Sequence, residues 1–240
     1  MAFLRTLRGT LWLGIFAYGL AALVVGLWPA RRDLPWTPLD LDQPIGPFTA
    51  VKIAALDGDP ARCRALLAQA GVAFRALPAR DDGAACRVEG AIAWRSGGTR
   101  TLNYQPASPA LACPLAAALV IWEAQVVRPE AARLLGSPVA RVDHFGTYAC
   151  RRIGRREGAA WSEHSRAAAI DVAGFVLVDG RRITVARDWQ TPGPKSAFLH
   201  AARDGACRLF GTTLSPDYNA AHRDHLHLDE AGRAGWRVCR

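Results

Sequence analysis

An uncharged apolar run near the N-terminus constrains the chain more than any other feature. The run covers residues 11–28, eighteen positions in all, and arginines flank it on both sides. Eighteen apolar residues in a helix are just long enough to cross the hydrocarbon core of a bilayer. A cleaved signal peptide is the alternative, but its apolar core is usually shorter, and no small-residue cleavage site ends this run. We therefore predict a cytoplasmic tip and an uncleaved transmembrane anchor over residues 1–28.

Cysteine usage predicts the compartment of the remaining chain. Six cysteines follow the anchor, and none forms a CxxC pair. An even number in this pattern favours disulfide bonds in an oxidising compartment, with buried free thiols as the alternative. We expect a single-pass protein of the inner (cytoplasmic) membrane whose C-terminal domain lies in the periplasm. The one pairing we predict is the short loop from Cys63 to Cys86. The other candidates are Cys113, Cys150, Cys207 and Cys239.

Composition places the chain among folded proteins. Hydrophobic residues make up 50% of the 240 positions and charged residues 21%, which excludes wholesale disorder. The net charge is +9, and only Lys52 and Lys195 are lysines, so arginine carries the basic excess. Such an excess suits a polyanionic partner, or equally a solvated surface. Charge alone therefore does not identify a partner, and we expect no nucleic-acid binding.

Proline content divides the chain beyond the anchor. Residues 29–50 contain five of the fifteen prolines and predict an extended stalk. Residues 51–240 would then form one folded domain. Helices are predicted after Pro60 up to Gly71, over 115–127, from Pro129 to Gly136, and over 195–210, each from its helix start and stop signals.

The second half of the domain alternates between apolar and polar residues, which indicates strands. We expect strands over 141–151, 170–178, 181–187 and 224–228, and a short C-terminal segment around Val238. Asp179-Gly180 predicts a tight hairpin turn between two of these strands. Helices first, then antiparallel strands with one inserted helix, predict an α+β domain with an antiparallel sheet and packed helices.

Two segments carry groups suited to chemistry. In the first, His164 precedes Asp171 by seven residues, and in a strand Asp171 faces away from the apolar Ile170 and Val172. In the second, residues 222–227 hold three of the six histidines. Strand alternation puts His225 and His227 on one face.

Imidazole and carboxylate are preferred zinc ligands, and a catalytic zinc keeps three protein ligands and an open position. His164, Asp171 and one histidine of the His225/His227 pair would supply those three ligands. A solvated strand rich in histidine is the alternative.

These residues resemble those of the zinc D,D-peptidases and their relatives, which include murein endopeptidases and the hedgehog signalling domain. The shared pattern is Ser-x-His, a carboxylate seven residues later and a distal His-x-His. More narrowly, the chain is similar to the bacterial extensin-like C-terminal domain proteins. The matching segments are residues 110–116, 148–151, 162–164, 170–175, 179–181, 205–207 and 239–240.

The resemblance implies a hedgehog/D,D-peptidase-like fold and a Zn²⁺ ion bound by His164, Asp171 and His227. It leaves two candidates for the general base: His225, with His222 as a helper of the transition state, or Asp224. Strand alternation favours His225 unless the strand begins late.

Three further positions bear on the resemblance. The resemblance also implies that Arg151 grips a substrate carboxylate, for which a planar guanidinium is suited; a surface arginine is the alternative. The chain departs from the family pattern at Ala167, where a glycine is expected, and at Ala168, where an asparagine is common. Alanine at position 167 would be unfavourable if the turn needs positive φ.

The function implied is a membrane-anchored metallopeptidase that hydrolyses an amide bond in the peptide stems of peptidoglycan, of the D,D-carboxypeptidase or endopeptidase type. A catalytically inactive metal-binding or cell-wall-binding module on the same fold is the alternative. The expected partners are therefore peptidoglycan peptide stems and the membrane.

Overall fold

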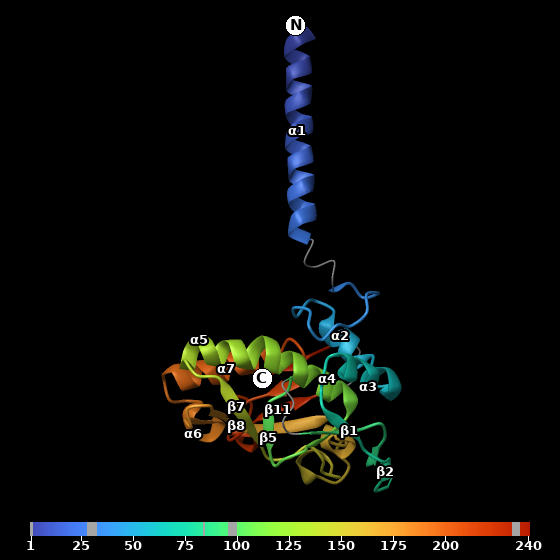
Figure 1. Cartoon of the computed structure of the whole chain (residues 1–240), viewed down its shortest axis with the longest axis vertical. Coiled ribbons are helices and arrows are strands. Elements are labelled where there is room, and N and C mark those ends of the chain that lie inside the picture. The colour runs from blue at the N-terminus through green and yellow to red at the C-terminus, as the bar shows by residue number, and fades with distance from the viewer. Residues whose placement is uncertain (1, 28–32, 84, 96–99, 232–235) are drawn as a thin grey trace.

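A long N-terminal helix and one folded domain make up the structure. The computed structural model describes residues 2–27, 33–83, 85–95, 100–231 and 236–240. Helix α1 (Ala2–Leu27) stands apart from the domain (Figure 1). Within this described part of the chain, no helix combines the length and the apolarity needed to span a membrane. Residues 1 and 28 of the predicted anchor lie outside the described residues, and the anchor stays a prediction.

A mixed sheet of seven strands forms the centre of the domain. Its order is β12-β10-β11-β8-β7-β5, and β9 also pairs with β8. Most pairs are antiparallel, as predicted, but β5 with β7 and β10 with β12 are parallel. The strands are β5 (Asn103–Gln105), β7 (Val139–His144), β8 (Ala169–Leu177), β9 (Arg182–Thr184), β10 (Thr212–Leu214), β11 (Leu226–Asp229) and β12 (Val238–Cys239).

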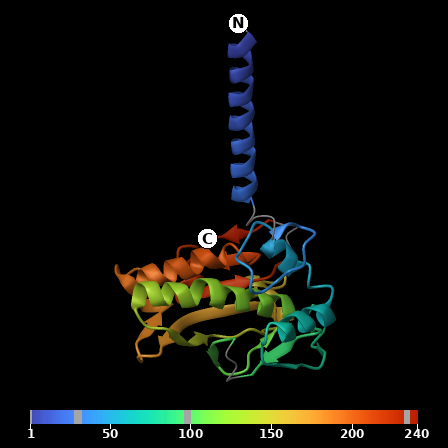
Figure 2. The same cartoon turned by 45° about the horizontal axis from the view of Figure 1, so that its top comes forward.

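Helices cover one face of this sheet (Figure 2). They are α4 (Cys113–Trp122), the π-helix η2 (Glu123–Val127), α5 (Arg128–Leu135) and α7 (Pro194–Ala206). Trp122 is fully buried between Phe175 of β8 and Phe210. Gly205 lets α7 approach η2 closely, because a Cβ there would lie 2.4 Å from a methyl group of Val126. The predicted α+β class is therefore confirmed.

A smaller N-terminal part packs beside the sheet. It contains α2 (Thr49–Ala54), α3 (Pro60–Gln69), a three-stranded sheet and a two-stranded hairpin. The three strands are β1 (Phe74–Ala76), β4 (Ile92–Trp94) and β6 (Ala110–Leu111), and the hairpin strands are β2 (Arg80–Asp81) and β3 (Arg87–Val88). The remaining helical elements are η3 (Ile153–Arg155), η4 (Glu163–Arg166), α6 (Val185–Asp188) and η5 (Ala220–His222).

The predicted elements exist, but several are shorter than predicted. The Asp179-Gly180 turn joins β8 to β9 as expected, with Gly180 at a φ of 84°. The strand predicted over 141–151 ends at His144, where its register against β8 shifts. The strand predicted over 181–187 ends at Thr184 and continues as α6, and the helix predicted over 195–210 ends at Ala206.

The stalk predicted over 29–50 is wrong for its described part, which begins at Asp33. The Asp33 carboxylate accepts hydrogen bonds from the Phe48 N–H (2.7 Å) and the Thr49 hydroxyl (3.1 Å) and forms an ion pair with Lys52 (2.6 Å). Leu41 is 1% exposed in the main core. Residues 33–48 therefore wrap onto the domain, because their apolar side chains complete its core. Residues 29–32 lie outside the described residues.

The three disulfides confirm the oxidised state but not the predicted pairing. Cys63 is bonded to Cys113, not to Cys86, because α3 packs against the start of α4. Cys86 is bonded instead to Cys150. The third bond joins Cys207 to Cys239, and no cysteine is free. The short-loop argument failed because Cys86 lies on the separate β2–β3 hairpin, which faces a different part of the domain.

A buried acid makes the stability of the fold depend on pH. Glu123 lies in the core, where its carboxylate accepts hydrogen bonds from the Leu102 N–H and the Tyr104 hydroxyl, both at 2.6 Å. Burial outweighs these bonds and raises the pKa of Glu123 to about 7. The folded protein therefore holds this proton more tightly than the unfolded chain, so the folded state loses stability as the pH rises from 4.5 to about 7.

We predict that Glu123→Gln removes this pH dependence. Between pH 5 and pH 8, the wild type should lose about 2–3 kcal/mol of unfolding free energy relative to the variant, because one pKa unit corresponds to about 1.4 kcal/mol. Denaturant unfolding at both pH values measures the difference. Parallel losses in the two proteins would contradict the assignment.

Candidate metal centre

Two neighbouring strands place Asp171 and His227 side by side. In the antiparallel pair β8–β11, His227 lies directly opposite Asp171. The flanking residues Ile170, Val172, Leu226 and Leu228 are fully buried on the helix-covered face. Alternation therefore turns Asp171 and His227 to the other face. The His227 Nδ1 atom lies 2.9 Å from the Asp171 Oδ1 atom.

A short turn before β8 brings in His164. The turn is the 3-10 helix η4, in which the Ser162 hydroxyl accepts a hydrogen bond from the His164 N–H (3.3 Å). The turn ends at Ala167, whose φ of 55° is left-handed. The position where the resemblance expects a glycine therefore does need positive φ. His164 itself is buried, and its imidazole points at Asp171.

The three side chains present their donor atoms to one point. The His164 Nε2 atom lies 3.2 Å from Asp171 Oδ1 and 3.3 Å from His227 Nδ1. Donors about 2.0 Å from a tetrahedral zinc ion lie about 3.3 Å from one another, so these separations fit a single ion. Within the described residues, this is the one group of three or more metal-ligating side chains that meets so closely.

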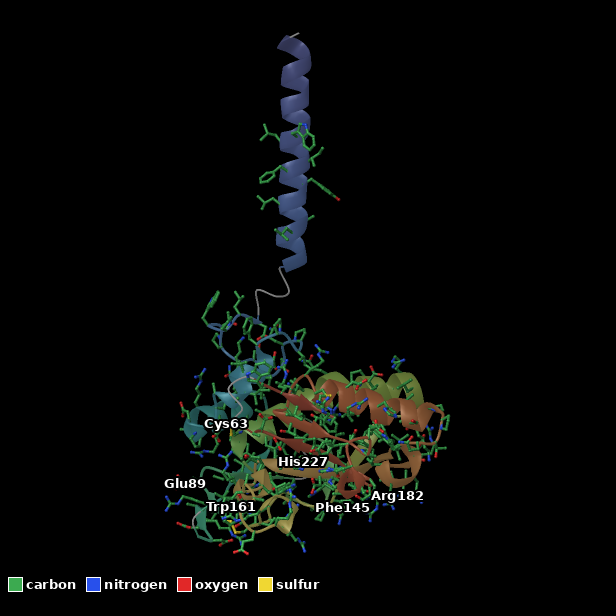
Figure 3. The ribbon with its side chains drawn as sticks, turned by 180° about the vertical axis from the view of Figure 1, so that it is seen from behind. Cys63, Glu89, Phe145, Trp161, Arg182 and His227 are labelled. Atoms are coloured by element: carbon green, nitrogen blue, oxygen red, sulfur yellow. A yellow bond between two sulfur atoms is a disulfide. The ribbon has the colours of Figure 1, made fainter. Side chains whose placement is uncertain are left out.

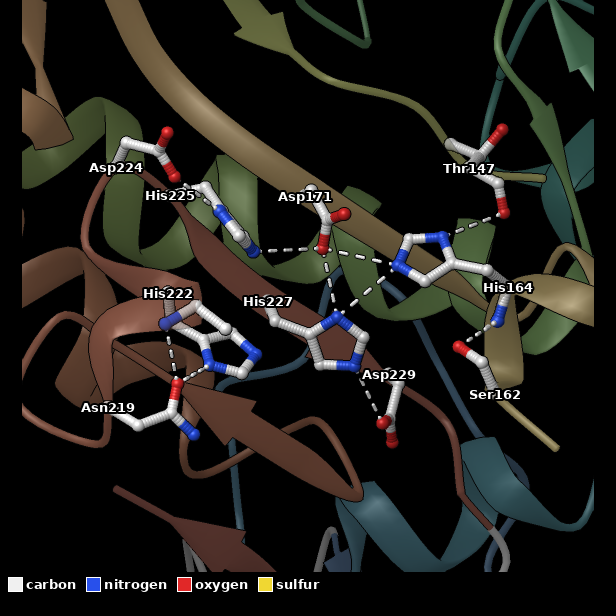
Figure 4. A network of polar contacts seen from close by, with 11 residues as sticks. Thr147, Ser162, His164, Asp171, Asn219, His222, Asp224, His225, His227 and Asp229 are labelled. Atoms are coloured by element: carbon white, nitrogen blue, oxygen red, sulfur yellow. Dashed lines mark hydrogen bonds and ion pairs between the residues drawn. The ribbon is translucent and has the colours of Figure 1, made fainter. Parts of the chain in front are cut away.

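Outer hydrogen bonds turn the correct nitrogens toward that point (Figure 4). The His164 Nδ1–H donates to the Thr147 carbonyl oxygen (3.3 Å), which leaves a lone pair on Nε2. The His227 Nε2–H donates to the Asp229 carboxylate (2.9 Å), which leaves a lone pair on Nδ1. Such outer partners fix the tautomer and raise the basicity of metal-binding histidines. The donor set therefore fits a zinc ion in chemistry as well as in spacing.

The electrostatics of the cluster also favour a cation. Burial would raise the pKa of Asp171, but hydrogen bonds from His164 and His227 hold it well below its usual range. Burial likewise opposes protonation of His227, yet the carboxylates of Asp171 and Asp229 raise its pKa to about 9. In the metal-free site a proton on His227 therefore balances the Asp171 carboxylate, and a metal ion bound between them would take the place of that proton.

The other two histidines of residues 222–227 lie beside the cluster. The His225 Nε2 atom is 3.5 Å from Asp171 Oδ1, and its Nδ1 is 2.9 Å from the Asp224 carboxylate. The rings of His222 and His225 lie 5.2 Å apart. Burial, and then repulsion by His225 and His227, lowers the pKa of His222 to about 4, so its ring is neutral at pH 7.

The argument that favoured His225 needs a correction. Strand β11 begins at Leu226, so neither Asp224 nor His225 belongs to it and alternation does not apply to them. His225 nevertheless faces Asp171, and the Asp224 carboxylate hydrogen bonds to His225. The two candidate bases are therefore a hydrogen-bonded pair and not independent alternatives.

The backbone of Arg151 contacts the segment that leads to His164. Its carbonyl oxygen accepts a hydrogen bond from the Ser162 N–H (3.1 Å), two residues before His164. Its side chain is half-buried, and among the described residues no carboxylate pairs with it. The proposed grip on a substrate carboxylate stays a prediction.

Three groups around the cluster were not predicted from the sequence. Asp229 could have been found, because it lies two residues after His227 and therefore on the same face. The Thr147 contact is made by a backbone carbonyl, which leaves no signal in the residue type. Asn219, whose Oδ1 lies 2.8 Å from the His222 Nδ1 atom, sits outside the histidine-rich segment.

A disulfide-linked hairpin supports the loop that orients His164. This loop, residues 145–151, contributes the Thr147 carbonyl and also the Ala149 N–H, which donates to the His164 carbonyl (3.0 Å). The β2–β3 hairpin holds the loop through the Cys86–Cys150 bond and through Asp82, which accepts from the Tyr148 hydroxyl (2.5 Å). The disulfide and the loop together hold His164 in place.

An α+β domain with a His–Asp–His cluster on the open face of its sheet is the class of protein that these observations define. The family model described as "Extensin-like protein C-terminus" matches residues 61–240, which is more than half of the chain. The chain therefore belongs to that family. Neither the search of curated proteins nor the search of solved structures found a match.

We predict that breaking the Cys86–Cys150 bond weakens metal binding without unfolding the domain. The double variant Cys86→Ala/Cys150→Ala should bind Zn²⁺ about 10–100-fold less tightly, the usual effect of losing an outer-shell support. Competition with a chromophoric chelator measures the affinity. Cys207→Ala/Cys239→Ala is the matched control, and it should keep the wild-type affinity. Equal losses in both variants would show a general loss of stability instead.

Proposed function

We propose that the protein is a zinc-dependent peptidase that acts on the peptide stems of peptidoglycan. One observation carries the proposal: His164, Asp171 and His227, from the η4 turn and two paired strands, direct their donor atoms to one point. Outer hydrogen bonds favour the tautomers of the two histidines that suit a cation. The resemblance to zinc D,D-peptidases, and to the hedgehog-type fold, supports it.

The number of ligands favours catalysis over a purely structural ion. A structural zinc site has four protein ligands, whereas a catalytic site has three and leaves one position open. Zinc bound by these three residues would supply Lewis-acid chemistry, lowering the pKa of a water molecule and polarising an amide carbonyl. His225 and His222 border the open side, where a substrate would enter.

The His225–Asp224 pair would move the proton. The Asp224 carboxylate accepts the Nδ1–H of His225, which leaves the lone pair of Nε2 directed at the site. An imidazole held in this way can take a proton from the attacking water and pass it to the leaving amine. In this proposal His225 is the general base, Asp224 orients it, and the neutral His222 is placed to help stabilise the transition state.

Compartment and charge favour a cell-wall substrate. Three disulfides suit an oxidising compartment, and the predicted anchor would hold the domain at the outer surface of the inner membrane. Peptide stems of peptidoglycan are the abundant amide substrate there, and a net charge of +9 suits their carboxylates. A D,D-carboxypeptidase would release a terminal D-alanine, whereas an endopeptidase would open cross-links, so product analysis on purified murein identifies the type.

Metal content tests the ligand set. The wild type should carry one zinc ion per chain, and His164→Ala, Asp171→Ala or His227→Ala should each abolish that binding, because two remaining ligands do not hold the ion. Elemental analysis after dialysis gives the result. His200→Ala is the control, since His200 stacks on Trp189 at 4.0 Å, outside the cluster, and that variant should keep its zinc. Full zinc in all three ligand variants would refute the site.

The turnover of two variants distinguishes the two candidate general bases. We expect His225→Ala to keep zinc and to lose amide hydrolysis by about 100-fold or more, the lower range of general acid–base catalysis. Asp224→Asn should lose less, because His225 stays in place. If Asp224→Asn abolished turnover and His225→Ala were nearly harmless, Asp224 would be the base. Zinc-loaded wild type without any turnover on murein would favour the non-catalytic metal-binding or wall-binding module.

A further inference from the structure

A row of four rings borders the candidate metal centre. Phe145 meets His225 edge to face, with ring centroids 5.8 Å apart. His225 lies 5.2 Å from His222, and His222 lies 5.6 Å from Tyr218. The row therefore has a histidine pair at its middle and an aromatic residue at each end. His222 also lies 5.9 Å from the ligand His227, so the row runs alongside the metal ligands.

The two end residues are exposed although they are large and apolar. Phe145 is 60% exposed and Tyr218 is 49% exposed. Exposed large hydrophobic side chains are few in the described part of the domain, and these two contact the candidate catalytic histidines directly. The set is Trp36, Val51, Phe145, Ile153, Val178, Tyr218 and Trp236. Exposed apolar residues grouped beside a polar site are typical of ligand contacts.

The backbone holds both end residues in place. The Phe145 N–H donates to the Asp171 carbonyl (2.8 Å), which ties Phe145 to the strand that carries a metal ligand. Figure 3 labels Phe145 and the candidate ligand His227 on the domain. The Tyr218 N–H donates to the Ser215 carbonyl (3.0 Å). The preceding residue, Asp217, accepts a hydrogen bond from the indole N–H of Trp189 (2.9 Å), a residue that is itself buried. The backbone that carries the two exposed rings is therefore held in place.

We infer that Phe145 and Tyr218 are substrate-binding residues that hold the peptide backbone on the two sides of the scissile amide. The inference rests on the proposed peptidase function and names the part of the substrate that the site recognises. Flat ring faces suit planar amides and the short side chains of stem peptides. No residue in the row carries a fixed charge, so the row suits the uncharged amide groups and small side chains next to the cleaved bond.

The position of the row favours peptide over sugar. Phe145 touches His225, which lies beside the reacting atoms, so the group that contacts Phe145 belongs to a residue adjacent to the scissile bond. The sugars of peptidoglycan are attached at the far end of the stem. A soluble stem peptide without sugars should therefore show the full effect of changes to the row.

The test uses the full chain and a soluble stem peptide. Binding is measured after chelator treatment, so that no peptide is consumed, and hydrolysis is measured with zinc. Phe145→Ala and Tyr218→Ala should each raise the dissociation constant and KM about tenfold, in the range of one aromatic contact, with little change in kcat and none in zinc content. Tyr218→Phe keeps the ring and should match the wild type. Val178→Ala removes an exposed apolar side chain in the turn after β8 and should also match.

The outcomes separate this inference from the proposed function. Weaker peptide binding by the Ala variants supports the inference even if the wild type hydrolyses nothing, in which case only the peptidase proposal fails. Hydrolysis by the wild type with unchanged KM in both Ala variants overturns the inference and leaves the peptidase proposal standing. An effect confined to glycan-bearing substrate would assign the rings to sugar and also overturn it. A wild type that neither binds nor cleaves the peptide overturns both.

Discussion

The carboxylate of Asp171, whose side chain is only 14% exposed, is the group around which the candidate site is built. An unpaired charge in that position would be strongly unfavourable, because desolvation of a carboxylate costs several kcal/mol. His164 and His227 compensate it, and both hydrogen bond to the same oxygen atom. His225 approaches that atom as well, at 3.5 Å. Three imidazoles around one oxygen are a stable arrangement only if protons or a metal ion balance the charge.

The fold meets this requirement through strand β8, whose two faces have different surroundings. On one face of β8, Ile170 and Val172 are fully buried under the helices and fix the register with β11. On the other face, that register determines which residue lies opposite Asp171, and a slip of one position would turn His227 into the core. The apolar core therefore controls the donor geometry through the register of the two strands.

How far the sequence predicts this site depends on whether each contact is local. Alternation placed Asp171 and His227 on one face correctly, because strand geometry links neighbouring residues. His164 was a candidate ligand from its residue type and spacing, but its approach to Asp171 depends on the η4 turn and not on strand geometry. The family resemblance supplied the choice of His227 over His225. The Cys86–Cys150 bond and the Thr147 carbonyl could not be predicted, because both depend on how the β2–β3 hairpin packs. The stalk was mispredicted for a similar reason: proline content describes chain stiffness and says nothing about burial of Leu41.

Ala167 shows how a departure from the family pattern can leave the site intact. Its φ of 55° is unfavourable for a residue with a Cβ, at about 1–2 kcal/mol. Its methyl group is fully buried against Val88 and Ala91, however, and one buried methyl contributes about 0.8 kcal/mol. Much of the strain is therefore offset by contact with β3 and the residues that follow it. The Ala167 N–H still donates to the His164 carbonyl (3.2 Å), so the turn that positions His164 closes with alanine. Alanine in place of glycine at position 167 therefore affects how the turn packs against β3. The donor atoms of the cluster keep their geometry.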